Sequence, residues 1–264
     1  SGVSISDGFL AGVVPGFLFA LVLIIVAVVI SHKRGYGGDR KYSGREKWCA
    51  FKDALLALLT PVIILGGIYS GTFTATEAAV IAVFYSVLVS MFIYKEMSWK
   101  ELAGVFLESG IASAAILLII SIAAVFGVIL SKQHVPQMLA HAFTAIAPNK
   151  YIFLLLVNIL LLIIGMFMEN SSSIIIMTPL LAPIAASYGV NLTHFGCIVV
   201  CNLAIGMVTP PFGLCLFTGN DLAQAKLGDT IRSLVPYLAV SMIALALVTY
   251  VPDISMGLVK LIAS

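Results

Sequence analysis

Long apolar runs separated by short polar stretches predict helices that cross a lipid bilayer. About 20 apolar residues are long enough to span the hydrocarbon core. Residues 9–31, 108–131 and 233–251 reach about that length. Residues 54–94 carry no Lys or Arg, and we expect two helical segments there that meet at the polar stretch 70–77.

The apolar run over residues 151–187 is interrupted by a polar centre, Glu169, Asn170 and three serines. Its two arms would be about 27 and 21 Å long at 1.5 Å per residue, near or below the hydrocarbon thickness of about 30 Å. A re-entrant hairpin, which enters and leaves on one face of the membrane, fits these lengths. Two complete crossings are the alternative.

The apolar run over residues 191–222 is interrupted by the octapeptide GMVTPPFG at residues 206–213. Pro210 and Pro211 lack a backbone N–H, and each ring crowds the preceding turn, so the helix must break here. Freed carbonyls in hydrocarbon are costly, so a helix broken at this depth is packed in protein or lines a polar cavity. The octapeptide therefore predicts an ion and substrate site, with a packing kink as the alternative.

The composition agrees with a membrane protein. Hydrophobic residues make up 61% of the 264 residues and charged residues 10%, against about 25% charged in soluble domains. Basic residues gather in the stretch 32–52, which predicts a cytoplasmic loop; a phospholipid- or nucleic-acid-binding patch is the alternative. Lys226 and Arg232 predict a second cytoplasmic loop at residues 223–232, before a last span and a tail.

The sequence does not indicate an enzyme. Cys197 and Cys201 lie one helical turn apart without a paired His, and we interpret them as small apolar filler. No nucleophile and base can be assembled from the four His, and no P-loop motif occurs, which favours a secondary process. An intramembrane hydrolase that uses Glu169 or a neighbouring serine is a remote alternative, and a purely structural subunit is another.

The two interrupted elements carry the oxygen atoms that a sodium ion needs. Hard cations take carbonyl, hydroxyl and carboxylate oxygens, and helix N-termini attract anions. A polar contact between helices is the alternative reading of the serines. The predicted Na⁺ ligands are Glu169, Asn170, Ser171, Ser173, Gly206, Met207, Val208 and Thr209, and the predicted substrate contacts are Ser171, Ser172, Thr209, Pro210 and Pro211.

A second intramembrane carboxylate has two interpretations. Thr74 and Glu77 match a capping box, in which each residue covers an exposed amide of the other at the start of a helix. A carboxylate at membrane depth is also a functional candidate, so Thr76 and Glu77 are candidates for ion coupling.

Several of these segments resemble one family. Residues 17–36, 61–79 (PVIILGGIYSGTFTATEAA), 194–196 (HFG) and 202–213 (NLAIGMVTPPFG) are similar, in the same order, to the second half of the large membrane subunit of tripartite ATP-independent periplasmic (TRAP) transporters. The hairpin tip departs from the family: Asp-X-Thr/Ser-Pro is frequent there, whereas this chain has Glu169-Asn170-Ser171-Ser172.

The resemblance implies an all-α integral membrane protein of the bacterial inner membrane. It would be an inverted-repeat, elevator-type symporter that imports an organic acid, either a sialic acid or a C4-dicarboxylate, with Na⁺ and without an organic cofactor. One repeat lies in this chain. The implied partners are a small four-helix membrane subunit, a periplasmic substrate-binding protein, the first-repeat half of the same large subunit, and lipid, with no nucleic acid. A stand-alone divalent-anion symporter is the alternative.

The chain is thus expected to have five parts. They are a span with the basic loop (1–53), paired helical segments with an interfacial stretch (54–107), a span with a periplasmic loop (108–150), the hairpin with the broken helix (151–222), and the last span with its tail (223–264).

Overall fold

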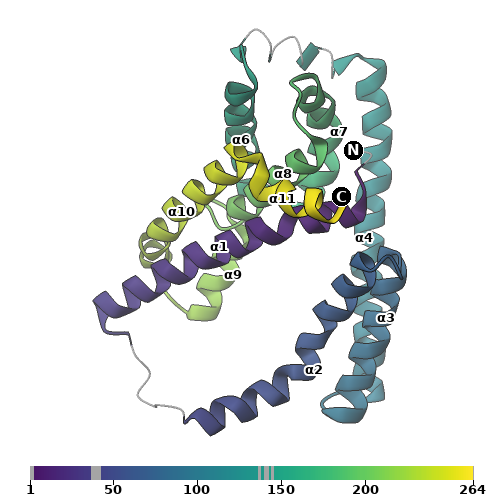
Figure 1. The fold of residues 1–264 in the computed structure, drawn as a ribbon, viewed down its shortest axis with the longest axis vertical. Helices are drawn as coiled ribbons and strands as arrows, with labels where there is room; N and C mark the ends of the chain where they lie inside the picture. The colour runs from purple at the N-terminus through teal and green to yellow at the C-terminus, as the bar shows by residue number, and fades with distance from the viewer. Residues whose placement is uncertain (1–2, 37–42, 136–137, 140–142, 144–145, 264) are drawn as a thin grey trace. The chain divides into compact units, whose positions relative to one another are not determined.

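All regular structure in the part of the chain that is described is helical (Figure 1). The computed structural model describes residues 3–36, 43–135, 138–139, 143 and 146–263. The all-α class predicted from the sequence is therefore confirmed. The elements are α1 (Ile5–Arg34), α2 (Gly44–Tyr69), α3 (Ala75–Leu88), the π-helical turn η1 (Val89–Ile93), α4 (Trp99–Lys132), α6 (Lys150–Phe167), α7 (Asn170–Ser187), α8 (Leu192–Gly206), α9 (Leu214–Ala223), α10 (Leu227–Tyr250) and α11 (Pro252–Ala263).

Seven helical segments among the described residues are long and apolar enough to cross a membrane. They include α6 and α7, the two arms of the predicted hairpin, each of 18 residues or about 27 Å. The segment α8 is a shorter apolar helix of 15 residues. Its shortness follows from the break that the prolines impose.

Several helices extend beyond the apolar runs from which they were predicted. Three predicted boundaries are therefore wrong. Most of the described part of the predicted basic loop 32–52 is helical, because α1 continues to Arg34 and α2 begins at Gly44. The last span begins at Leu227, so Arg232 lies in a helix and not in a loop. The predicted tail after residue 251 contains helix α11. Charged side chains continue a helix readily where its end reaches water, so hydropathy marks only the apolar part.

Part of the predicted periplasmic loop, at residues 136–137, 140–142 and 144–145, lies outside the described residues.

The two segments predicted within residues 54–94 are confirmed as α2 and α3, which are joined by a short turn. Gly71 lies in that turn with φ +69°, a conformation that favours glycine.

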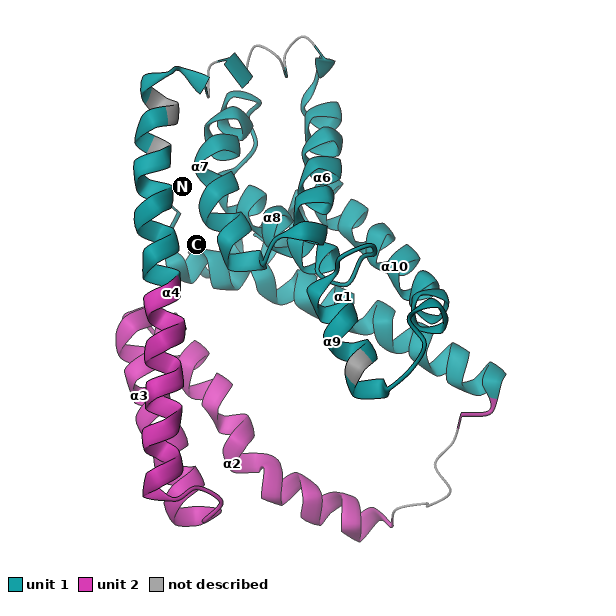
Figure 2. Ribbon diagram, turned by 180° about the vertical axis from the view of Figure 1, so that it is seen from behind, with its two compact units in different colours: residues 1–34, 116–264 teal, residues 35–115 magenta. Residues whose placement is uncertain are grey.

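The chain divides into two compact units (Figure 2). Unit 1 comprises residues 1–34 and 116–264, and unit 2 comprises residues 35–115. In unit 1, helix α8 packs against α6, α7 and α10, while α1 packs against α8, α10 and α11. The core lies between α6, α7 and α8, with Phe153, Leu161, Ile198 and Leu203 among its fully buried side chains.

Side-chain caps begin the helices that form the interrupted elements. The Asn149 carboxamide accepts hydrogen bonds from the backbone of Tyr151 and Ile152 at the start of α6. Asn191 accepts in the same way from Thr193 and His194 at the start of α8. Each cap satisfies amides that the helix itself leaves unpaired.

Unit 2 is built from α2, α3, η1 and the first part of α4. Helices α2 and α3 pack against each other as an antiparallel pair after the turn at residues 70–74. The Tyr85 hydroxyl donates to the Leu56 carbonyl at 2.8 Å, and the Tyr94 hydroxyl donates to the carbonyl of Asp53. Gly67 allows the Phe73 ring to lie against α2, since an added methyl group would be 2.5 Å from that ring.

Candidate functional site

The tip of the hairpin is organised by Glu169. This residue is the N-cap of α7, and its two carboxylate oxygens accept from the backbone amides of Ser171 and Ser172 at 2.9 and 3.0 Å. The two serine hydroxyls donate to the same oxygens at 3.0 and 3.3 Å. The carboxylate thus closes the positive end of the helix and orients both hydroxyls.

Two further oxygen atoms at the tip are buried. The Ser173 hydroxyl donates to the Glu169 carbonyl at 2.9 Å, and its side chain is fully buried. The Asn170 Oδ1 atom is buried and accepts no hydrogen bond within the described part of the chain. A buried acceptor without a partner is costly unless a water or an ion completes it, so the Asn170 Oδ1 atom fits the predicted role of cation ligand.

The break between α8 and α9 leaves carbonyl groups free. The amides of Val208 and Thr209 donate to the Ile205 and Gly206 carbonyls, and the Thr209 hydroxyl donates to the Ile205 carbonyl at 2.7 Å. Among the described residues, the carbonyls of Val208 and Thr209 accept no hydrogen bond. These carbonyls and the lone pairs of the Thr209 hydroxyl remain available to a cation.

Gly213 allows the broken segment to fold tightly before α9. A methyl group added there would lie 2.7 Å from the Met207 carbonyl oxygen and 2.9 Å from that of Thr209. The Met207 carbonyl accepts from the amide of Cys215, one residue into α9. Pro210 and Pro211, the predicted substrate contacts, lie between the two half-helices.

The structure brings the hairpin and the broken helix together. Gly165, in the last turn of α6, faces Gly206, the last residue of α8. A methyl group added at Gly206 would lie 2.7 Å from the Gly165 Cα atom, so only glycine permits this approach. The rings of Phe167 and Phe212 add a contact, with centroids 5.3 Å apart. The end of α6, just before the hairpin tip, therefore packs against the end of α8, just before the break.

A cluster of amides links α6 to α8, with Asn202 buried and Asn158 half-buried, and it was not recognised in the sequence. The Asn202 Nδ2 atom donates to the Asn158 Oδ1 atom at 2.6 Å and to the Asn158 carbonyl at 2.9 Å. The Asn158 Nδ2 atom donates to the Thr249 hydroxyl at 3.1 Å. A sequence signal existed, because polar residues within apolar membrane helices are rare and mark functional positions.

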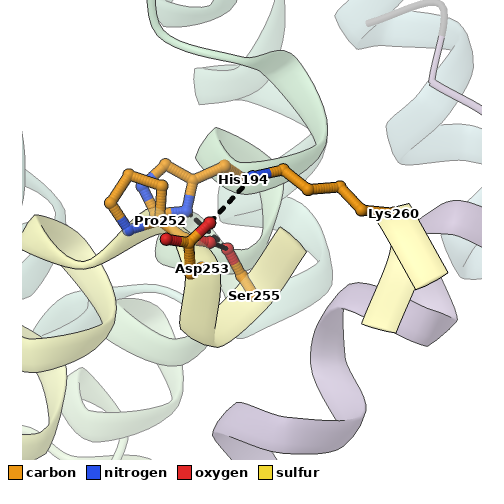
Figure 3. Close-up of polar contacts among 5 residues, drawn as sticks. All are labelled: His194, Pro252, Asp253, Ser255 and Lys260. Carbon is orange, nitrogen blue, oxygen red and sulfur yellow. Dashed lines mark hydrogen bonds and ion pairs between the residues drawn. The ribbon is translucent and has the colours of Figure 1, made fainter. Parts of the chain in front are cut away.

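His194 ties the start of α8 to the junction of α10 and α11 (Figure 3). Its ring is buried, with Nδ1 2.6 Å from the Ser255 Oγ atom and Nε2 3.2 Å from the Thr249 carbonyl oxygen. A carbonyl only accepts, so Nε2 carries a hydrogen. The Ser255 hydroxyl lies 3.0 Å from the Pro252 carbonyl, so its single hydrogen serves either this carbonyl or His194 Nδ1. The sequence analysis named His194 only within the segment 194–196 that resembles the family and gave it no role.

An exposed ion pair lies on α11, close to the junction of α10 and α11 (Figure 3). The Lys260 ammonium donates to the Asp253 carboxylate at 2.7 Å and lowers the pKa of that carboxyl. Its stabilising effect is present above the ordinary carboxyl pKa and is lost as the pH falls through the lowered value. Both side chains are exposed, so solvent and salt weaken the pair.

The remaining candidates have local structural roles. In unit 2, the Glu77 carboxylate accepts from the Thr74 amide at 2.8 Å and the Thr74 hydroxyl accepts from the Glu77 amide, which confirms the predicted capping box. Thr76 lies in the first turn of the same helix. In unit 1, the Cys197 thiol donates to the Ala11 carbonyl at 3.5 Å, and the described residues contain no group of three or more His, Cys, Asp or Glu that could hold a metal ion.

Comparison with known proteins adds a family match. Residues 1–254 match the family described as the DctM component of tripartite ATP-independent periplasmic transporters. The chain is 42% identical over 97% of its length to the C4-dicarboxylate TRAP transporter large permease protein DctM of Pseudomonas aeruginosa. It is 40% identical over 96% of its length to the isethionate TRAP transporter permease protein DctMQ of Oleidesulfovibrio alaskensis. It is 37% identical over 99% of its length to the sialic acid TRAP transporter large permease protein SiaM of Vibrio cholerae.

The chain spans only part of these relatives. It covers 60% of the Pseudomonas protein, 61% of the Vibrio protein and 40% of the Oleidesulfovibrio protein. All three relatives are named as permeases, which agrees with the expectation that the chain is not an enzyme.

Proposed function

Because the chain belongs to the DctM component family of tripartite ATP-independent periplasmic transporters, we propose that it provides a sodium and organic-acid site of a symporter. The chain is a multi-pass protein of the inner membrane. In the proposed mechanism, hairpin and broken helix move together between the two faces of the membrane, as in an elevator. Sodium and substrate move with them.

The observation that carries this proposal is the contact between Gly165 and Gly206. It joins the last turn of α6, which leads into the hairpin tip with its serine hydroxyls and the Asn170 oxygen, to the last residue of α8. The break that follows α8 has two carbonyls that accept no hydrogen bond among the described residues. Sodium requires such oxygens in place of its hydration water. The proposed ligand set comprises Glu169, Asn170, Ser171, Ser173, Gly206, Met207, Val208 and Thr209.

The charge pattern supports an anion next to the cation. Helix α9 begins after the break, and the N-terminus of a helix attracts negative charge, whereas the N-terminus of α7 is already capped by the Glu169 carboxylate. Sodium adds positive charge at the same place. The relatives named for C4-dicarboxylate, isethionate and sialic acid support an organic acid as the substrate class. Ser171, Ser172, Thr209, Pro210 and Pro211 are its proposed contacts.

The energetics allow sodium to drive uptake. Each Na⁺ that moves inward through a potential of 100 mV supplies about 2.3 kcal/mol. Two ions that move with a monovalent anion carry one net positive charge inward, so the potential alone would concentrate that anion about 50-fold without ATP. The proposed partners are the remaining half of the large subunit, a small membrane subunit and a periplasmic substrate-binding protein.

Substitution of two hydroxyls tests the site. The complete permease would be reconstituted in proteoliposomes with its binding protein, and uptake of C4-dicarboxylates and sialic acid measured against sodium concentration. We expect Thr209→Ala to raise the sodium concentration required for half-maximal uptake, because it removes a proposed sodium ligand. Ser172→Ala should raise it through weaker binding of the coupled substrate, because Ser172 is a proposed substrate contact.

The matched control is Thr218→Ala on α9. The Thr218 hydroxyl donates to the carbonyl four residues earlier at 3.0 Å, as the Thr209 hydroxyl does, but it lies outside the proposed site. Sodium dependence that is unchanged in both site variants would refute the assignment.

A further inference from the structure

Besides the two glycines, a hydrogen-bonded pair of asparagines joins α6 and α8. Asn158 precedes Gly165 by two helical turns on α6, and Asn202 precedes Gly206 by about one turn on α8. The amide pair and the glycine pair therefore lie along one seam. The amide pair binds by side-chain hydrogen bonds of 2.6 and 2.9 Å, and the glycine pair permits close backbone approach.

The orientation of the Asn202 amide is determined by its neighbours. Its Nδ2 atom faces two oxygen atoms of Asn158, so nitrogen must occupy that position and Oδ1 must face the other way. The Asn202 side chain is fully buried, and Oδ1 accepts no hydrogen bond within the described residues. The amide therefore carries the desolvation cost of an unsatisfied acceptor.

That cost argues against a purely stabilising role for the amide pair. An apolar side chain of similar size would fill the seam without burying an unpaired oxygen. What hydrogen bonds add over apolar contacts is a defined register between the helices. The bond from Asn158 to Thr249 extends this constraint to α10, so three helices are held in one register.

We propose that Asn202 and Asn158 are positioning residues for the sodium site, an inference that rests on the proposed function. The hairpin tip follows directly from α6, and the break follows directly from α8. The register of the two helices therefore sets the distance between the tip oxygens and the free carbonyls of Val208 and Thr209. Loss of the amide bonds lets the helices shift and weakens the cation site without removing any of its ligands.

Sodium-dependent thermal stability tests this role without knowledge of the substrate. The purified complete permease would be heated at increasing sodium concentration, with potassium added to keep the ionic strength constant. A ligand that binds the folded state raises its unfolding temperature. Asn202→Leu should raise the half-saturating sodium concentration about tenfold or more, the effect expected when the outer support of a metal site is removed.

Two related variants refine the test. Asn158→Leu leaves the Asn158 backbone carbonyl as an acceptor, so it should give a smaller shift of the same sign and provides a milder variant if Asn202→Leu does not fold. Asn202→Asp loses the donor but keeps an oxygen in place of Oδ1, and it should bind sodium as weakly as Asn202→Leu. Sodium binding that is preserved or tightened in Asn202→Asp would overturn the proposal, because it would make Asn202 a ligand.

The control is Leu181→Ala, which opens a cavity in the buried core on α7, a helix that carries neither amide. It should lower the unfolding temperature without sodium and leave the half-saturating sodium concentration unchanged. If both Asn variants behave like this control, the amide pair is merely structural and the inference fails. If the wild-type permease itself shows no sodium-dependent rise, the proposed sodium coupling fails instead.

Discussion

At the scale of single residues, the proposed site depends on two glycines, which lack a Cβ atom, as much as on the side chains that supply oxygen atoms. Gly165 and Gly206 have no Cβ atom, and this lets α6 and α8 approach until their backbones touch. The third glycine of these two helices, Gly196, has no such neighbour: a methyl group added there would meet nothing within 4 Å. The sequence therefore does not show which glycines lie at a close contact between helices and which do not.

We predict that Gly206→Ala separates the two helices. The added methyl group meets backbone atoms that cannot rotate away, and overpacking of this kind costs about 1–3 kcal/mol. Thermal unfolding of the purified permease should show a lower midpoint, together with weaker sodium binding. Gly196→Ala on the same helix is the matched control and should change neither quantity. Equal effects of the two substitutions would contradict the assigned contact.

The residue scale also shows where the sequence analysis stopped. The sequence analysis identified the candidate oxygen atoms at the tip and the break because serines, prolines and glycines stand out within an apolar run. Asn158, Asn202 and His194 were given no role of their own. Asn202 binds Asn158, and the other two bind residues 249 and 255, partners that no local pattern connects.

At the scale of elements, capping residues decide where the helices of the site begin. Asn149, Glu169 and Asn191 each accept hydrogen bonds from backbone amides of the helix that follows. Gly189, with φ +71°, ends α7 and turns the chain into α8, and the Val190 amide donates to the Ala185 carbonyl. The sequence predicted the first arm and the end of the second arm to within one residue. It placed the start of the second arm after the serines, whereas α7 already begins at Asn170, because the Glu169 cap draws the polar residues into the first helical turn.

We predict that Asn191→Ala loosens the start of α8. The substitution leaves the amides of Thr193 and His194 without their acceptor, which costs about 1 kcal/mol at an N-cap. Hydrogen exchange measured by mass spectrometry should become faster in the first turn of α8. Asn191→Ser restores an accepting oxygen and should return the exchange close to that of the wild type. A wild-type exchange rate in Asn191→Ala would show that tertiary contacts alone hold this turn.

At the scale of the whole molecule, the chain corresponds to 60% of the length of the Pseudomonas relative. Large apolar side chains are exposed along α1, α2 and α4, as expected for surfaces covered by lipid or by other helices. The proposed symport therefore belongs to the assembly, with this chain contributing one site.

We predict that uptake by the complete permease depends on its periplasmic binding protein. Proteoliposomes that contain the permease should accumulate organic acid in a sodium gradient only when the binding protein is added. The measurement is the uptake of radiolabelled C4-dicarboxylate or sialic acid with and without that protein. Full uptake in its absence would favour the alternative, a stand-alone divalent-anion symporter.

The sequence alone determined the helical class, the membrane location and the two interruptions. These follow from short-range chemistry: apolar side chains leave water, proline lacks an amide hydrogen, and a carboxylate caps the amides beside it. The tertiary structure alone decided that Gly165 meets Gly206 and that Asn202 binds Asn158. Such contacts join residues about 40 positions apart, and they depend on how three helices pack at once, which no local stretch of sequence specifies.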